Sequence, residues 1–291
     1  MYQKNLGKQI WEILSPIIIY NVALMVVEMI FIGIQYVNNL GRIAVLSGTP
    51  EEVRAGVIEI LSEVLEYSVE MMGIAAFCSI PIFLYMMKRD RLREGAEMLR
   101  VNQKAPASKY ILIVGLCIPF ALGLNNLMIM LNIAAYSSAY QEAVEVFYGA
   151  RLIVQIVTLG ILTPIAEELI FRGLIYNRMK LVMKSPKGAM IFSGLLFGFY
   201  HGNLVQTIYG CLCGFLLAYL YEKYGSIKAP VLGHICMNMV SLILTEANVF
   251  VWMFENVVRM GIITVVCATL ASSIFLFVQK IDEKPLKNEQ N

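Results

Sequence analysis

Two histidines and a pair of adjacent glutamates stand in or beside apolar stretches of this chain, where ionisable side chains are rare. His201 and His234 are the only histidines among 291 residues, and Glu167 and Glu168 directly follow the apolar run 152–166. Ionisable groups are costly to keep in hydrocarbon, so a chain that retains them there generally uses them. Glutamate and histidine can act as a general base and a proton carrier, which is chemistry that water attack on an amide requires.

The spacing around the two glutamates predicts different roles for them. Arg172 follows Glu168 by four residues, so the two lie about 40° apart around a helix, whereas Glu167 lies about 140° from Arg172. We therefore expect Arg172 to hold Glu168 in an ion pair and Glu167 to be free to act. Taken alone, the motif is also consistent with a structural ion-pair network among all three residues.

Each histidine has a partner at helical spacing. Phe197 precedes His201 by four residues and places an aromatic ring beside its imidazole, and Asn238 follows His234 by four residues. His234 and Asn238 can therefore converge on a single point, as the donors of an oxyanion site do. Either motif alone is equally consistent with a buried polar contact between helices.

The composition predicts an all-α, polytopic membrane bundle. Hydrophobic residues make up 58% of the chain and charged residues 15%, and the mean hydropathy is +0.69. A helical span needs about 20 mostly apolar residues, and the uncharged runs predict about eight transmembrane helices. We expect one integral membrane domain over residues 1–291, in contact with the lipid bilayer and without a nucleic-acid partner.

The distribution of charge between the apolar runs predicts the orientation of the chain in the cell membrane. Lysine and arginine dominate the segments 88–109 and 176–188, whereas 38–70 and 136–150 are acidic. Because basic loops collect on the cytoplasmic side, the first two segments are expected inside and the other two outside. An even number of spans then places both termini of this multi-pass protein in the cytoplasm.

Two interruptions of helices are expected near the ionisable residues. The run 188–221 contains no Asp, Glu, Lys or Arg, and a single helix of that length would extend about 51 Å, too long for a hydrocarbon core of roughly 30 Å. We therefore predict a turn at Gly202 and Asn203. Thr163 and Pro164 resemble an N-cap and a first helical residue, which predicts that a helix restarts there.

A further helix is expected outside the membrane. Thr49 and Glu52 form a capping box around Pro50, and apolar residues then recur at helical spacing. This pattern predicts an amphipathic helix over 49–70 that lies on the outer surface or begins the next span. Such a face more commonly packs on the bundle or on lipid than binds a partner.

Together the motifs resemble, in order and spacing, those of the CPBP intramembrane proteases, also called the Abi or CAAX prenyl endopeptidase type II family. The resemblance covers about 151–245 and rests on Glu167-Glu168-x-x-x-Arg172, Phe197-x-x-x-His201 and His234-x-x-x-Asn238. It implies an eight-helix glutamic protease that hydrolyses a membrane-associated peptide or protein without a cofactor. By this likeness, Glu167 activates water with assistance from His201, His234 and Asn238 stabilise the oxyanion, and Glu168 and Arg172 hold the site in place.

Other functions remain open from the sequence. Zinc-dependent hydrolysis could use His201, His234 and Glu167 as three metal ligands, although the HExxH signature is absent. A transporter or proton relay would use the same residue types and would accommodate Glu28 in the first apolar run, but it predicts repeated halves, which the sequence lacks. A non-catalytic scaffold or immunity protein is the third alternative.

Overall fold

The computed structural model describes residues 5–39, 49–94 and 105–281, and all regular structure in these ranges is helical. Seven segments in these ranges are long and apolar enough to span a membrane. They are α1 (Leu6–Asn38), α4 (Ser68–Glu94), η2 (Ala107–Tyr110) with α5 (Ile111–Met130), the segment from α7 (Leu152–Val157) to α9 (Asn177–Met183), α11 (Leu204–Tyr224), α12 (Lys228–Glu246) and α14 (Val257–Gln279). The chain is thus a polytopic helical membrane bundle, as predicted.

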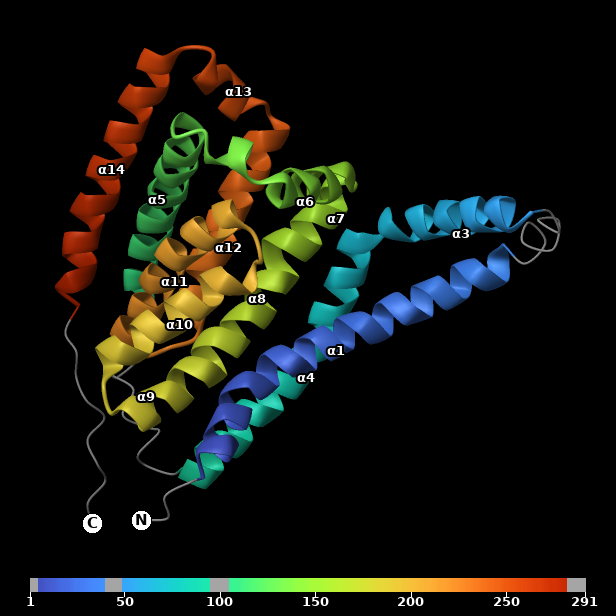
Figure 1. The fold of residues 1–291 in the computed structure, drawn as a ribbon. Coiled ribbons are helices and arrows are strands. Elements are labelled where there is room, and N and C mark those ends of the chain that lie inside the picture. Colours follow the sequence, from blue (N-terminus) through green and yellow to red (C-terminus); the bar gives the residue numbers. More distant parts are fainter. Residues whose placement is uncertain (1–4, 40–48, 95–104, 282–291) are drawn as a thin grey trace.

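An eighth apolar helix, α10 (Pro186–Tyr200), is shorter than these seven. Its 15 residues rise about 22 Å, and α11 runs back beside it (Figure 1). Between them Gly202 adopts a positive φ of 72°, and the Asn203 side chain caps α11 by accepting from the backbone N–H of Gln206. The predicted turn at Gly202 and Asn203 is confirmed, and it leaves His201 at the C-terminal cap of α10.

Glycines allow α10 and α11 to pack closely. A Cβ atom added to Gly214 would lie 2.8 Å from the Cα of Gly194, and one added to Gly198 would lie 2.5 Å from the carbonyl oxygen of Thr207. Small residues at such positions let the backbones of membrane helices approach each other. The close approach fixes the height of the turn that carries His201.

We expect Gly214→Ala to destabilise the protein by roughly 1–3 kcal/mol, because the added methyl group meets backbone atoms that cannot move independently. Gly261→Ala is the matched control, since a Cβ at Gly261 in α14 meets nothing within 4 Å. Unfolding of both variants in mixed detergent micelles measures the difference. Equal stability of the two variants would contradict the close packing described here.

The glutamates lie on one uninterrupted helical segment. It consists of α7, the π-helical turn η4 (Thr158–Leu162), α8 (Thr163–Glu168), the π-helical stretch η5 (Leu169–Tyr176) and α9. Leu162 and Thr163 both have right-handed helical backbone angles, and the Thr163 hydroxyl makes no hydrogen bond within the protein. The prediction of a helix restart capped by Thr163 is therefore wrong. In hydrocarbon a free helix end has no water to bind, so the chain accommodates Pro164 with a π turn instead.

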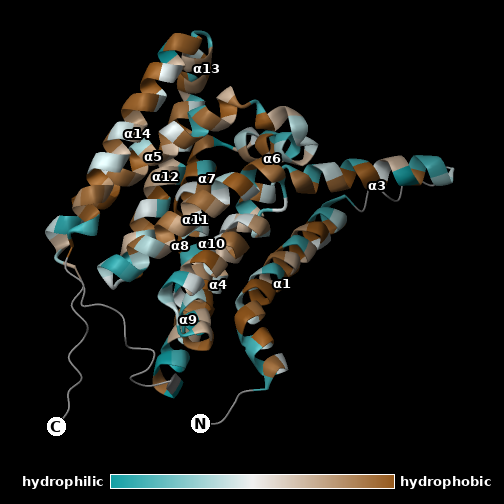
Figure 2. Cartoon of the chain, turned by 60° about the vertical axis from the view of Figure 1, so that its left-hand side comes forward, coloured by the Kyte–Doolittle hydropathy of each residue, from teal (hydrophilic) through white to brown (hydrophobic). Residues whose placement is uncertain are grey.

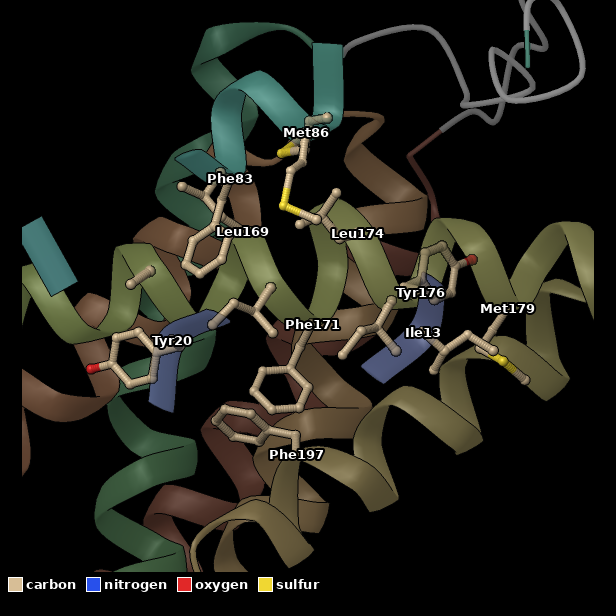
Figure 3. Close-up of a cluster of buried hydrophobic side chains, with 14 of the residues drawn as sticks. Ile13, Tyr20, Phe83, Met86, Leu169, Phe171, Leu174, Tyr176, Met179 and Phe197 are labelled. Carbon is tan, nitrogen blue, oxygen red and sulfur yellow. The ribbon is translucent and has the colours of Figure 1, made fainter. Parts of the chain in front are cut away.

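Two hydrophobic clusters hold the bundle together on either side of these glutamates. The first joins α1, α4, η5 and α10, and Figure 3 shows Phe171 against Phe197 within it. The second joins α5, α11, α12 and α14. The outward surfaces of α1 and α14 are mainly hydrophobic, with hydrophilic residues gathered near the helix ends (Figure 2). This arrangement fits a bundle surrounded by lipid.

The amphipathic helix α3 (Pro50–Leu65) has the predicted N-terminus, since both hydrogen bonds of the Thr49–Glu52 capping box are present. It ends at Leu65, and α4 begins at Ser68. α3 is thus a separate helix and not the start of the next span, and its location on the outer surface stays a prediction. The short elements η3 (Ile133–Tyr136), α6 (Ser138–Gly149) and α13 (Val249–Phe254) lie near the upper end of the bundle in Figure 1.

Candidate active site

A buried ion pair lies at the centre of the site. Arg172 donates from Nη1 to Glu168 Oε1 over 2.7 Å and from Nη2 to the Gly214 carbonyl oxygen over 2.9 Å. Both charged side chains are fully buried. The Arg172 guanidinium also lies 4.6 Å from the centre of the Phe197 ring. The predicted pairing of Glu168 with Arg172 is confirmed, and it joins α8 and η5 to α10 and α11.

His234 lies between the two glutamates. Its Nδ1 is 2.9 Å from Glu168 Oε1, and its Nε2 is 3.7 Å from Glu167 Oε2. Because an ionised carboxylate only accepts hydrogen bonds, the short contact assigns the proton of the neutral imidazole to Nδ1. Glu168 thus orients His234 as well as binding Arg172, a contact that the sequence did not predict.

His201 has a defined tautomer for a similar reason. Its Nδ1 lies 2.8 Å from the Phe197 carbonyl oxygen, and since a carbonyl only accepts, Nδ1 carries the proton of the neutral ring. Its Nε2 therefore has a lone pair that can accept a proton. The Phe197 ring centre lies 5.0 Å from that of His201 and 5.5 Å from that of His234. The predicted aromatic wall is confirmed, and it contacts both histidines.

Asn238 binds the π-helical turn η4, whereas His234 binds Glu168, so the two side chains do not converge on a single point in the protein alone. Its Nδ2 donates to the Leu159 carbonyl oxygen over 2.8 Å. In the π register of η4, where the Thr163 N–H donates to the Thr158 carbonyl, the carbonyl of Leu159 would be paired with residue 164. That residue is proline and has no N–H. Asn238 supplies the missing donor and keeps its second amide hydrogen for another acceptor.

A cavity of about 580 Å³ connects these residues. It is lined by residues of α1, α4, α5, η3, α6, η4, α8, α10, α11, α12 and α13, among them Glu167, Phe197, His201, His234 and Asn238. Glu168 and Arg172 do not line it, and both lie beneath its wall. The two glutamates therefore differ as their spacing predicted: Glu167 faces the cavity, and Glu168 is held in an ion pair with Arg172.

Two residues that line the cavity with Glu167 were not found from the sequence: Tyr20 of α1 and Tyr200 of α10. Tyr20 stands in a long apolar run, and the chain has 15 tyrosines, so no local pattern distinguishes it. Thr163 of α8 also lines the cavity, although the sequence predicts it only as a helix cap.

Within the described ranges, no group of three or more His, Cys, Asp or Glu side chains is arranged to hold a metal ion. The zinc alternative needs His201, His234 and Glu167 to point at one centre. Nδ1 of each histidine is engaged, by a backbone carbonyl in His201 and by a carboxylate in His234, so Nε2 is the nitrogen that each ring has left for another partner.

Comparison with known proteins agrees with the motif region. Residues 149–240 match the family described as type II CAAX prenyl endopeptidase, Rce1-like. A protein of Bacillus subtilis (strain 168) named "Putative membrane peptidase YdiL" is 30% identical over 111 residues, which are 37% of this chain and 43% of that protein. The chain therefore aligns with less than half of this relative. No solved structure matches significantly. The family resemblance is confirmed over the segment that carries the three motifs.

Proposed function

We propose that this protein is an intramembrane endopeptidase that hydrolyses a peptide bond with water activated by a glutamate. The observation that carries the proposal is the division between the two glutamates: Glu167 faces the cavity, whereas Glu168 is fixed by Arg172 and His234. A carboxylate presented to a cavity beside two histidines is an arrangement suited to general base catalysis. The matches to CAAX endopeptidases and to a protein named as a membrane peptidase support the same chemistry.

In the proposed reaction, Glu167, His201 and His234 have different roles. Glu167, assisted by Nε2 of His201, accepts a proton from water as the water oxygen adds to the carbonyl carbon of the scissile bond. The tetrahedral intermediate then collapses, the C–N bond breaks, and the same proton passes to the leaving amine. His234 keeps its Nδ1 proton directed at Glu168, and in the oxyanion role proposed below it carries a proton on Nε2 as well, so that it can donate from that nitrogen.

The oxyanion of the intermediate needs hydrogen-bond donors. The second amide hydrogen of Asn238 is available, since only one is directed to Leu159. His234 reaches the same cavity from one turn earlier on α12. We assign these two residues to the oxyanion site, with the resemblance to the family motif as support. Asn238 and His234 would then both donate to the carbonyl oxygen of the substrate.

We further propose that hydrolysis proceeds without a metal ion. The support for this proposal is that no group of three or more His, Cys, Asp or Glu side chains among the described residues is arranged to hold a metal ion. Retention of activity by purified protein after treatment with a chelator is the expected result. Loss of activity that is restored by added zinc would establish the alternative mechanism.

The substrate is proposed to be a membrane-associated peptide or protein, because the cavity opens within a bundle of membrane helices.

We also propose that both termini face the cytoplasm. In Figure 1 the start of α1, the end of α14 and α9 lie at one end of the bundle, and the basic segment 176–188 includes α9. Labelling of single introduced cysteines from either side of the membrane tests this orientation.

The function is tested by comparing the peptides of membranes that contain the wild type, Glu167→Gln or His201→Ala. We expect the same precursor fragments to accumulate in both variants and the corresponding products to disappear. Identical peptide profiles for the wild type and both variants, at equal protein levels, would refute the protease and leave a scaffold function as the better interpretation.

A further inference from the structure

Tyr20 is the last buried residue along α1, which has no other buried residue after Pro16. Only 6% of the most apolar stretch of α1 is buried, yet the Tyr20 side chain is 3% exposed. It lines the same cavity as Glu167. Tyr20 also lies far outside residues 149–240, so the family match assigns it no role.

The register of α1 is fixed by a contact two turns before Tyr20. Pro16 has no N–H to donate to the carbonyl oxygen of Glu12, and Arg178 of α9 donates to that carbonyl instead. Arg178 also binds Asp90 of α4 over 2.7 Å. These contacts connect α1 to α4 and α9 and hold Tyr20 at the height of the glutamates.

The Tyr20 hydroxyl makes no hydrogen bond of good geometry within the protein, and the Thr163 side chain lies within interaction range of it. Its ring packs in the first hydrophobic cluster, and its hydroxyl points away from Phe171 and Phe197 (Figure 3). Tyrosine hydroxyl groups usually find a partner when they are buried. We therefore expect the Tyr20 hydroxyl to bind a polar atom of a molecule that enters the cavity.

Thr163 presents a second hydroxyl of the same kind. Its Oγ1 is buried and has no partner within the protein, and Thr163 precedes Glu167 by four residues on α8. A helical threonine often binds the carbonyl four residues earlier, which here is Leu159. That oxygen accepts from Asn238. Thr163, Tyr20 and Glu167 thus bring three polar groups to the cavity wall, and both Thr163 and Glu167 lie within interaction range of the Tyr20 hydroxyl.

We propose that Tyr20 and Thr163 hold the water molecule that Glu167 activates. This inference rests on the proposed function. A buried water needs two to four polar partners, and these residues supply three. Tyr20 donates to the water oxygen, whose hydrogens bind Glu167 and Thr163, so one lone pair remains to attack the carbonyl carbon. Only Glu167 changes its protonation state, and Tyr20 keeps its proton throughout.

The test is a kinetic comparison of Tyr20→Phe with the wild type on a cleaved peptide. We expect kcat to fall by about tenfold to a hundredfold, as for the loss of one hydrogen bond in a charged site, with KM unchanged. Tyr224→Phe is the matched control: it removes a buried hydroxyl bound to the Lys109 carbonyl in the other cluster, and it should retain the wild-type kcat.

Substitutions of Thr163 test the same water site independently, because their result does not depend on whether the Tyr20→Phe variant folds. Thr163→Val should lose activity to a similar degree, whereas Thr163→Ser keeps the hydroxyl and should restore it. A wild-type kcat in either Tyr20→Phe or Thr163→Val, or a changed KM with constant kcat, would overturn the proposed water site. Full activity of Glu167→Gln would instead refute the proposed function, whatever the Tyr20 variants show.

Discussion

Glu167→Gln is expected to slow peptide hydrolysis by about a thousandfold or more while leaving the bundle folded. Loss of a general base typically costs about 10²–10⁴ in rate, and glutamine has nearly the same shape but cannot accept the proton of water. The bundle should remain folded because Glu167 is not part of the Glu168–Arg172 ion pair. The rate is measured with reconstituted protein and a peptide that accumulates in membranes of the inactive variant.

Glu222→Gln is a suitable control for this change. Glu222 lies on α11, where it binds Tyr176 and Lys180, and it does not line the cavity. The same loss of a carboxylate there should leave the cleavage rate close to that of the wild type. A Glu167→Gln rate within tenfold of the wild type would show that another group activates the water.

Local chemistry in the sequence predicted several elements correctly. Gly202 and Asn203 mark the turn between α10 and α11 because glycine accepts a positive φ and asparagine caps the next helix. The Thr49–Glu52 capping box likewise depends on residues only three apart. Such features are readable because their partners are close in the chain.

The Thr163–Pro164 pair was misinterpreted because its meaning depends on a distant residue. In water the same pair would favour a helix start. Here a π turn and the amide of Asn238, 79 residues from Leu159, satisfy the backbone groups that Pro164 disturbs. The helix therefore continues through Thr163 and Pro164, and the Leu159 carbonyl that Pro164 leaves unpaired accepts from Asn238.

In the active site, too, the sequence predicts contacts between residues close in the chain but not contacts between distant residues. The pair Glu168–Arg172 follows from a spacing of four residues, and so does the packing of Phe197 beside His201. By contrast, the bond between His234 and Glu168 joins residues 66 apart. Tyr20 belongs to a different helix altogether. Only the packing of α1, α8, α10 and α12 determines that these side chains meet.

Arg172→Met is expected to destabilise the protein by about 3–5 kcal/mol, because it leaves the fully buried carboxylate of Glu168 without its counter-charge. Methionine retains much of the volume, so loss of packing contributes less than the isolated charge. Unfolding in mixed detergent micelles measures the effect. Lys180→Met is the control, since its ion pair with Glu222 is partly exposed and such pairs contribute about 0–1 kcal/mol.

The double variant Glu168→Gln with Arg172→Met separates charge from shape. Removing both charges leaves no unpaired ion, so the double variant should be more stable than Arg172→Met alone by roughly 1–3 kcal/mol. Glutamine can still accept from Nδ1 of His234, and the imidazole should keep its orientation beside Glu167. If the double variant were no more stable than the single one, the role of Arg172 would lie in its contacts with Gly214 and Phe197 and not in neutralising Glu168.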